Sequence, residues 1–161
     1  MFLRILILQL MLSLQIATVQ AQDALTPAEQ AEFKALIKKA EEGDAKSQHF
    51  MGLIYLKGIP GIPVNFTKSK EWFEKSAIAG DALSMYNLGL LHSYGKGVAF
   101  SNENAYVMIA LSARFKVEAA KTKQIVFAKL VPPAELPKLD AKVEAWQLNT
   151  PLPLTTPKGP F

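Results

Sequence analysis

Residues 43–58 read GDAKSQHFMGLIYLKG, and residues 80–95 read GDALSMYNLGLLHSYG. The two stretches match at an offset of 37 residues, through Gly-Asp-Ala at the start and a Gly in the middle and at the end. Beyond the closing Gly the matches continue at an offset of 36, as far as Ser76-Ala77 with Ser112-Ala113. The slip of one residue falls in a Gly/Pro loop, where chains tolerate insertions. A register that is kept on both sides of such a loop indicates an internal repeat.

Each repeat is predicted to contain two helices. The first helix of the first repeat spans about 45–57, and the second begins at Asn65 or Thr67. Small and apolar residues follow at helical spacing and predict the buried face of the second helix, namely Ser69, Trp72, Phe73, Ser76 and Ala77. Gly52 and Gly89 fall in mid-helix, where Gly costs ~1 kcal/mol relative to Ala. We therefore expect a neighbouring helix to cross closely at both positions.

Helix signals also flank the repeats. Thr26-Pro27-Ala28-Glu29 combines a capping residue, a Pro at the first helical position and a Glu three residues after the cap, and opens a helix to about residue 42. Further helices are predicted over 117–130 and 134–148, separated by Pro132-Pro133, which gives seven helices in total. Gly58 and Gly95 are predicted to end the first helices as left-handed caps. Residues 149–161 contain four Pro and are predicted to form an extended or disordered tail.

The N-terminal segment has the composition of a secretory signal peptide. Arg4 precedes a mostly apolar run from Ile5 to Ile16, and small residues lead to a predicted cleavage site after Ala21. The alternative is a retained membrane anchor over residues 1–19, but polar residues interrupt the run, and it falls short of the ~20 apolar residues of a spanning helix. We expect the mature chain to be periplasmic or secreted.

The composition excludes several kinds of chemistry. The 161 residues include no Cys and two His, so disulfides and Cys-based catalysis or metal binding are excluded and a His-rich metal site is not expected. The net charge of +4 is dispersed, and the Lys clusters are interleaved with Glu, which disfavours a nucleic-acid partner. Phosphate-binding, nucleophile and metal-binding motifs are absent from the sequence, so no catalytic, cofactor-binding or metal-ligating residue is predicted.

These motifs resemble those of the Sel-one-like repeat (SLR) family, which is related to the tetratricopeptide repeats. The resemblance covers about residues 40–147 and implies an all-α fold, an α/α solenoid of about seven helices wound into a right-handed superhelix. Full repeats are expected at about 43–79 and 80–116, with helical caps on both sides, in one domain over 22–148. The chain departs from the family pattern at five positions, which are Ser69, Ser76, His92, Met108 and Ser112.

The resemblance implies a non-enzymatic scaffold of the bacterial cell envelope that binds a protein or peptide. In helical-pair repeats the first helices line the concave face. The expected partner-binding residues are the positions that alternate with the motif residues, namely Lys46, His49, Leu53, Lys57, Leu83, Tyr86, Leu90 and Tyr94. We call these eight residues the first-helix stripe. The mature protein is expected to be a monomer or weak dimer that has no membrane contact.

Other interpretations stay open at this point. The apolar part of the stripe marks a partner site if it is exposed, but flanking helices could equally cover it. A second hypothesis is a membrane-tethered assembly factor that retains residues 1–19. A third is a cell-wall enzyme that uses His49 and nearby carboxylates as acid and base. His92 replaces a packing Tyr and is predicted to be half-buried, while Trp72, Phe73 and Trp146 are predicted to be core residues rather than a ligand box.

Overall fold

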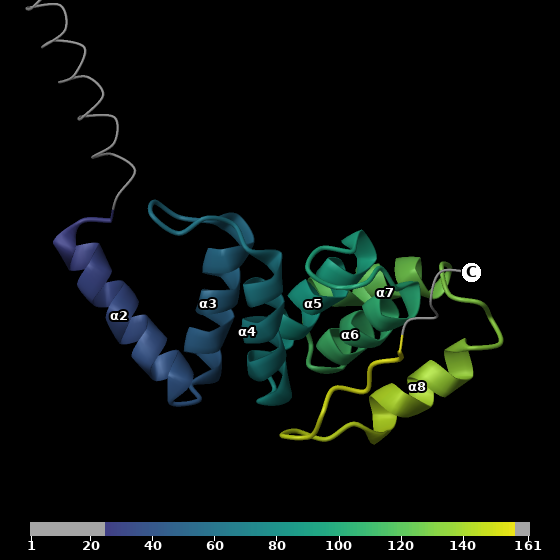
Figure 1. The fold of residues 1–161 in the computed structure, drawn as a ribbon. Coiled ribbons are helices and arrows are strands. Elements are labelled where there is room, and N and C mark those ends of the chain that lie inside the picture. Colours follow the sequence, from purple (N-terminus) through teal and green to yellow (C-terminus); the bar gives the residue numbers. More distant parts are fainter. Residues whose placement is uncertain (1–24, 157–161) are drawn as a thin grey trace, which may run out of the picture.

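The structure, a computed structural model, describes residues 25–156 and contains seven α-helices in that range (Figure 1). The helices are α2 (Pro27–Glu41), α3 (Ala45–Lys57), α4 (Phe66–Ile78), α5 (Ala82–Tyr94), α6 (Asn102–Arg114), α7 (Glu118–Ala128) and α8 (Leu136–Ala145). The all-α prediction is confirmed, with helix ends that differ from the predicted ones by up to three residues. The predicted signal peptide, residues 1–21, lies outside the described residues. Over residues 25–156, none of the helices has the length and apolarity needed to cross a membrane.

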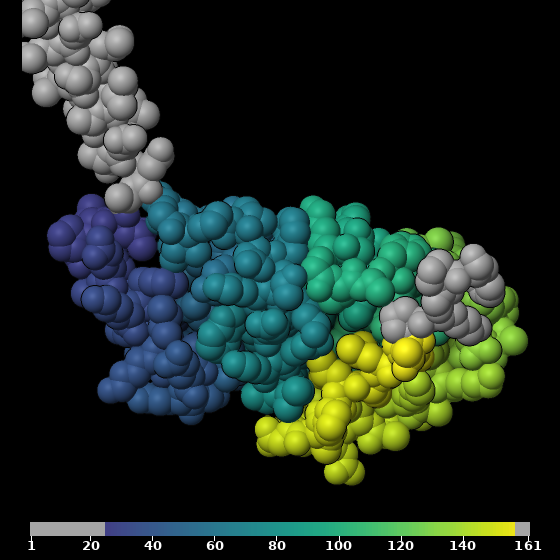
Figure 2. Space-filling view, viewed as in Figure 1, coloured from purple at the N-terminus to yellow at the C-terminus, as the bar shows by residue number. Residues whose placement is uncertain are grey.

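The helices stack in chain order. The two helices of each repeat pack against each other, α3 on α4 and α5 on α6, and α4 packs on α5 to join the repeats. At the two ends, α2 packs on α3, while α7 and α8 pack on α6. Figures 1 and 2 show the resulting elongated array, in which α2 to α7 lie beside their neighbours in sequence and α8 returns to pack on α6. This is the helical-repeat solenoid predicted from the 36- and 37-residue offsets.

The turn between successive units recurs three times with the same hydrogen bonds. Its first residue donates its backbone N–H to an Ala three residues earlier, and the next residue donates to a carbonyl five residues earlier. The first residues of the three turns, Gly43, Gly80 and Lys116, have φ of 96°, 96° and 68°. The structural repeat therefore extends to the start of α7, where a Lys occupies the position that Gly holds twice before.

Replacing Lys116 by Gly is expected to stabilise the fold by about 1 kcal/mol. A side chain at positive φ is strained by ~1–2 kcal/mol, and the larger entropy of Gly in the unfolded chain offsets only part of the gain. Urea unfolding followed by circular dichroism would measure the change. Lys129→Gly is the matched control, because Lys129 also follows a helix but has φ of −74°, where Gly brings only its entropic cost. A Lys116→Gly variant that loses stability as Lys129→Gly does would contradict the strain.

Both mid-helix glycines lie where a second helix crosses, as predicted. A Cβ at Gly52 would lie 2.4 Å from Cδ1 of the Phe73 ring on α4. A Cβ at Gly89 would lie 2.7 Å from Cγ1 of Ile109 on α6. The missing side chain therefore lets the paired helices of each repeat approach closely.

The serines that replace the family's Ala bond the helices to one another. Ser76 Oγ donates to the Ala45 carbonyl over 2.7 Å, and Ser112 Oγ donates to the Ala82 carbonyl over the same distance one repeat later. Ser69 Oγ donates to the Gly52 carbonyl over 2.8 Å. Because each hydroxyl has a carbonyl partner on the preceding first helix, these departures from the family pattern are compatible with a buried interface.

The predicted helix caps hold with one exception. Thr26 and Glu29 form the full capping box, and Gly95 adopts the left-handed conformation after α5. Gly58 was also predicted as a left-handed cap, and this is wrong. Its φ is positive at 73°, but its ψ is 154°, because the chain leaves α3 in an extended conformation toward a tight turn in which Ile59 and Ile62 exchange backbone hydrogen bonds.

The core is continuous from α4 to the end of the array. Phe73 and Trp146 belong to it, as predicted, and the Met108 that replaces an aromatic residue is fully buried in it. Trp72 differs from the prediction, since it is only half-buried and holds the Lys75 ammonium 4.4 Å from its ring centroid.

The C-terminal tail also differs from the predicted disorder over its described part. Leu152 and Leu154 pack against the core, and Thr155 is hydrogen-bonded to the side chain of Asn104. Residues 150–156 contain no helix or strand, and the Leu154 N–H donates to the Leu152 carbonyl across Pro153, so the chain turns there while its partners hold it in place. Residues 157–161 lie outside the described part of the chain.

Candidate binding surface

The first-helix stripe is exposed at its ends and covered in its middle. Leu83 and Tyr94 on α5 are 51% and 66% exposed, and Lys46 and Lys57 at the ends of α3 are exposed as well. The remaining apolar members, Leu53, Tyr86 and Leu90, are half-buried, and the first two pack against the core. The apolar surface available to a partner is therefore smaller than the sequence suggests and is centred on α5.

His49 was predicted as a surface member of the stripe, and the structure corrects this. It is 9% exposed and turns inward between α4 and α5. Its Nδ1 lies 2.9 Å from Ser84 Oγ and 3.2 Å from Asp81 Oδ1. The residue falls on the edge of the stripe, and the polar partners that the next repeat supplies draw its ring into the interface between repeats.

The hydroxyl groups around His49 settle which atom donates. Ser76 Oγ donates its proton to the Ala45 carbonyl, and Ser84 Oγ donates to Ser76 Oγ over 2.9 Å. Since each hydroxyl has one proton, Ser84 Oγ must accept from the Nδ1–H of His49. The imidazole therefore donates to Ser84 in this arrangement and cannot act as its general base. The chain of hydrogen bonds joins α3, α4 and α5 through one buried polar cluster.

Asp81 combines two structural roles in that cluster. It caps α5 by accepting from the Ser84 backbone N–H over 2.6 Å, and it faces the His49 ring. Burial alone would raise the pKa of the Asp81 carboxyl, but the hydrogen bonds from His49 and Ser84 outweigh burial and lower the pKa below its ordinary 3.8. Asp44, the equivalent residue of the first repeat, makes the same cap and has no His partner.

His92 is buried more fully than predicted. It is 5% exposed, its Nδ1 lies 3.4 Å from the Ala99 carbonyl, and its Nε2 has no hydrogen-bond partner among the described residues. Burial lowers the pKa of the His92 imidazole below its ordinary 6.5, because a charged ring is poorly solvated there. The neutral form is therefore the one that the fold accommodates.

The protein is expected to lose stability as the pH falls below about 6.5, in part through His92. The unfolded chain takes up the proton first because the folded pKa is the lower one, so the stabilisation present at higher pH is lost on acidification. Urea unfolding at pH 7.5 and 5.5 would measure this loss. In His92→Tyr, which restores the residue of the first repeat, the difference between the two pH values should shrink. An unchanged difference would contradict the role of His92.

Sequence reasoning missed other exposed apolar side chains. Phe50 lies beside His49 on α3, Val126 lies in the last turn of α7, and Leu130 follows α7 by two residues. An offset of 36 residues maps Leu90 onto Val126 and Tyr94 onto Leu130, so the repeat register itself could have identified the last two. Apolar surface therefore recurs at equivalent positions of the second and third units.

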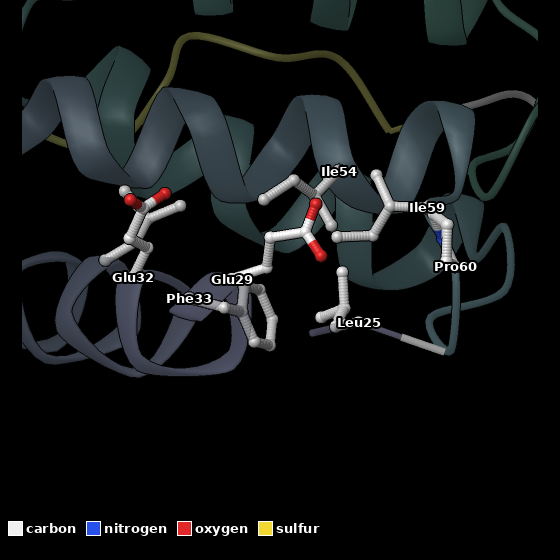
Figure 3. Close-up of a pocket in the computed structure, with 8 residues that line it drawn as sticks. Leu25, Glu29, Glu32, Phe33, Ile54, Ile59 and Pro60 are labelled. Atoms are coloured by element: carbon white, nitrogen blue, oxygen red, sulfur yellow. The ribbon is translucent and has the colours of Figure 1, made fainter. Parts of the chain in front are cut away.

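An apolar cavity of about 460 Å³ lies between α2, α3 and the loop after α3 (Figure 3). Phe33 and Leu36 of α2 face Ile54 of α3, and Leu25, Ile59 and Pro60 close one end. Figure 3 shows the carboxylates of Glu29 and Glu32 pointing from α2 toward α3 at this cavity. No sequence pattern indicates this cavity, because it forms where the flanking helix α2 meets a loop that is distant from it in the chain.

The described residues offer few means of holding a metal ion. Among residues 25–156, no group of three or more His, Asp and Glu side chains comes together in a suitable arrangement. His49 has one carboxylate nearby, and His92 has none among its hydrogen-bond partners in that range.

Comparisons with known proteins agree on the repeat. The sequence model of the Sel1 repeat family matches residues 45–81 and 82–105. Two curated Arabidopsis thaliana relatives, the ERAD-associated E3 ubiquitin-protein ligase components HRD3A and HRD3B, are 33% and 28% identical over 43% and 53% of this chain. The chain spans only 10% and 20% of their length.

Two solved structures share the fold. A Sel1 repeat protein from Oxalobacter formigenes is 31% identical, with a TM-score of 0.53 over 55% of this chain and 66% of that one. A protective antigen of uropathogenic Escherichia coli strains, described as displaying an SLR fold, has a TM-score of 0.63 at 20% identity, over 68% of this chain and 23% of that one. With the repeats matched in sequence and the stacked helix pairs matched in space, the chain is a Sel1-like repeat protein.

Proposed function

We propose that this chain is a non-enzymatic scaffold that binds a protein or peptide through the exposed part of the first-helix stripe. The observation that carries the proposal is the pair of large apolar side chains on α5, Leu83 and Tyr94, each more than half exposed. Apolar side chains clustered on a surface are typical of a partner site. Phe50 on α3 adds a third exposed apolar side chain on the neighbouring first helix.

The family supports a role in protein interaction. The two plant relatives are named as components of a ubiquitin ligase, which is a multi-protein assembly, and helical repeat arrays in general present extended surfaces to partners. His49 is 9% exposed and its Nδ1 lies within hydrogen-bond distance of Ser84 in the next repeat, which supports a structural role for this residue. We also propose that the partner is a protein or peptide and not a nucleic acid.

Site-specific photo-crosslinking in cells would test the surface. A benzophenone amino acid is placed at Tyr94 on α5 and, as a matched control of similar exposure (60%), at Phe100 in the loop before α6. The proposal expects a discrete crosslinked protein from position 94 that is absent from position 100. The same product from both positions, or none from position 94, would contradict it.

We also propose that the protein acts in the cell envelope after removal of residues 1–21. The support is the sequence of that segment alone. The intact mass of the exported protein is the direct test, with a chain that begins at Gln22 as the expected result. A mass that includes residues 1–21 would favour the tethered assembly factor instead.

A further inference from the structure

The C-terminal tail lies along the second helices of the array, away from the first-helix stripe. The Asn149 backbone N–H donates to the Ile78 carbonyl at the end of α4 over 2.8 Å, and Trp146 Nε1 donates to the Pro151 carbonyl over 3.1 Å. From there the chain runs to Asn104 in the first turn of α6. Figures 1 and 2 show this yellow segment crossing the outside of the helices from α4 to α6.

The side chain of Asn104 holds the far end of the tail through hydrogen bonds to the tail backbone. Its Nδ2 donates to the Thr155 carbonyl over 3.0 Å, and its Oδ1 accepts from the Thr155 N–H over 2.7 Å. Thr155 Oγ1 also donates to Oδ1 over 2.8 Å. Asn104 is 1% exposed, so a buried amide is devoted to both backbone polar groups of one tail residue. Paired contacts of this kind recognise the backbone and accept a hydroxyl side chain beside it.

The Asn104 side chain that holds the tail has no counterpart in the first repeat. The first repeat has Lys68 at the position equivalent to Asn104, and Lys68 is exposed at the start of α4. Leu152 and Leu154, on either side of Pro153, fill the apolar surface between the two anchored ends of the tail. The groove thus combines a backbone clamp with an apolar floor that takes the two Leu side chains flanking Pro153, where the Leu154 N–H donates to the Leu152 carbonyl over 2.8 Å and closes a tight turn.

We propose that this groove is a second binding site, for a peptide of the pattern apolar-Pro-apolar-Thr or Ser that turns at its Pro as the tail does, and that the chain's own tail is its intramolecular occupant. We name the groove the Asn104 groove. A partner segment with the same pattern displaces the tail and takes its contacts. The site is independent of the first-helix stripe, since it lies on the second helices and none of its residues belongs to the stripe.

The tail competes strongly with any added peptide for the Asn104 groove as long as its own contacts are intact. A segment joined by a short linker acts at an effective concentration in the millimolar range, so an added peptide reaches the groove only when it overcomes this advantage. Removing the two Leu contacts from the tail should release the groove without altering the groove itself. The accessible site should then bind the tail sequence supplied as a separate molecule.

The test uses a fluorescent peptide NTPLPLTT, the sequence of residues 149–156, and the full chain carrying Leu152→Asp and Leu154→Asp. Fluorescence anisotropy should show binding at least tenfold tighter to this variant than to the wild-type chain. Adding Asn104→Ala to the variant should weaken binding at least tenfold. Equal binding by the wild-type and tail-released chains would overturn the proposal and leave the tail as a structural strap.

A peptide control covers the case in which Asn104→Ala does not fold. The peptide NTPDPDTT carries the same two Asp substitutions, and the protein is left as the tail-released variant. Loss of at least tenfold in affinity with this peptide supports a groove that reads the two apolar side chains. If NTPDPDTT binds as tightly as NTPLPLTT, the groove does not contact the two Leu side chains and the proposal fails.

Discussion

Gly52→Ala is expected to destabilise the fold by about 3 kcal/mol, because overpacking a tight core costs ~1–3 kcal/mol and this site lies at the upper end. The added methyl would meet the fully buried ring of Phe73 at 2.4 Å. In an exposed helix the same substitution stabilises by ~1 kcal/mol, so the sign of the effect reports the helix crossing directly. Urea unfolding monitored by circular dichroism gives the change in the free energy of unfolding.

A second substitution separates the clash from a general loss of structure. Phe73→Leu alone should destabilise, since it removes part of a buried ring. Combined with Gly52→Ala it should cost less than the sum of the two changes, because the smaller side chain makes room for the methyl. Additive costs, or a neutral Gly52→Ala variant, would show that α3 and α4 do not cross as closely as described.

Asp81→Ala is expected to cost about 3 kcal/mol, from a lost N-cap of ~1 kcal/mol and a lost charged hydrogen bond of ~1.5–3 kcal/mol. The substitution leaves the His49 N–H with Ser84 Oγ as its sole partner in the cluster and removes the cap of α5. Both losses loosen the junction between the two repeats. Thermal or urea unfolding of the full chain measures their sum.

Asp44→Ala is the matched control. Asp44 caps α3 through the Ser47 N–H over 2.7 Å, in the same way that Asp81 caps α5, but it is exposed and has no His beside it. Its removal should cost no more than the loss of a helix cap, and so clearly less than the removal of Asp81. If both substitutions cost the same, the contact between His49 and Asp81 contributes nothing to stability.

The fold could be predicted from the sequence because the repeat is local. Gly-Asp-Ala marks a turn and a cap at each joint, and mid-helix Gly marks a crossing, so short patterns were enough to find the helices and their pairing. The failures lie where a residue depends on distant partners. His49 contacts Ser84, which is 35 residues away in the chain. The position of a residue along one helix does not tell whether a His at the edge of a face points to solvent or into the interface with the next repeat.

The tail shows the same limit. Its Pro content favours disorder. Composition cannot reveal that the Thr155 N–H donates to the Asn104 side chain, 51 residues earlier in the chain. The stripe could be located from the register, but its exposure could not, because Leu53 and Tyr86 are covered by tertiary packing that a single helix does not reveal. Local rules therefore gave the scaffold, and the surfaces that distinguish this chain from other arrays depend on long-range contacts.

The central claim is that the exposed stripe of α5 binds the partner. The most direct measurement is the dissociation constant of the purified partner, identified by crosslinking, for the wild-type chain and for Leu83→Asp/Tyr94→Asp. Val64→Asp/Phe100→Asp is the control, since these loop residues are 48% and 60% exposed and lie off the stripe. The account predicts at least a tenfold weaker affinity for the stripe variant, a loss of about 1.4 kcal/mol or more, and a change of less than about twofold for the control. Wild-type affinity in the stripe variant, with its fold intact, would contradict the claim.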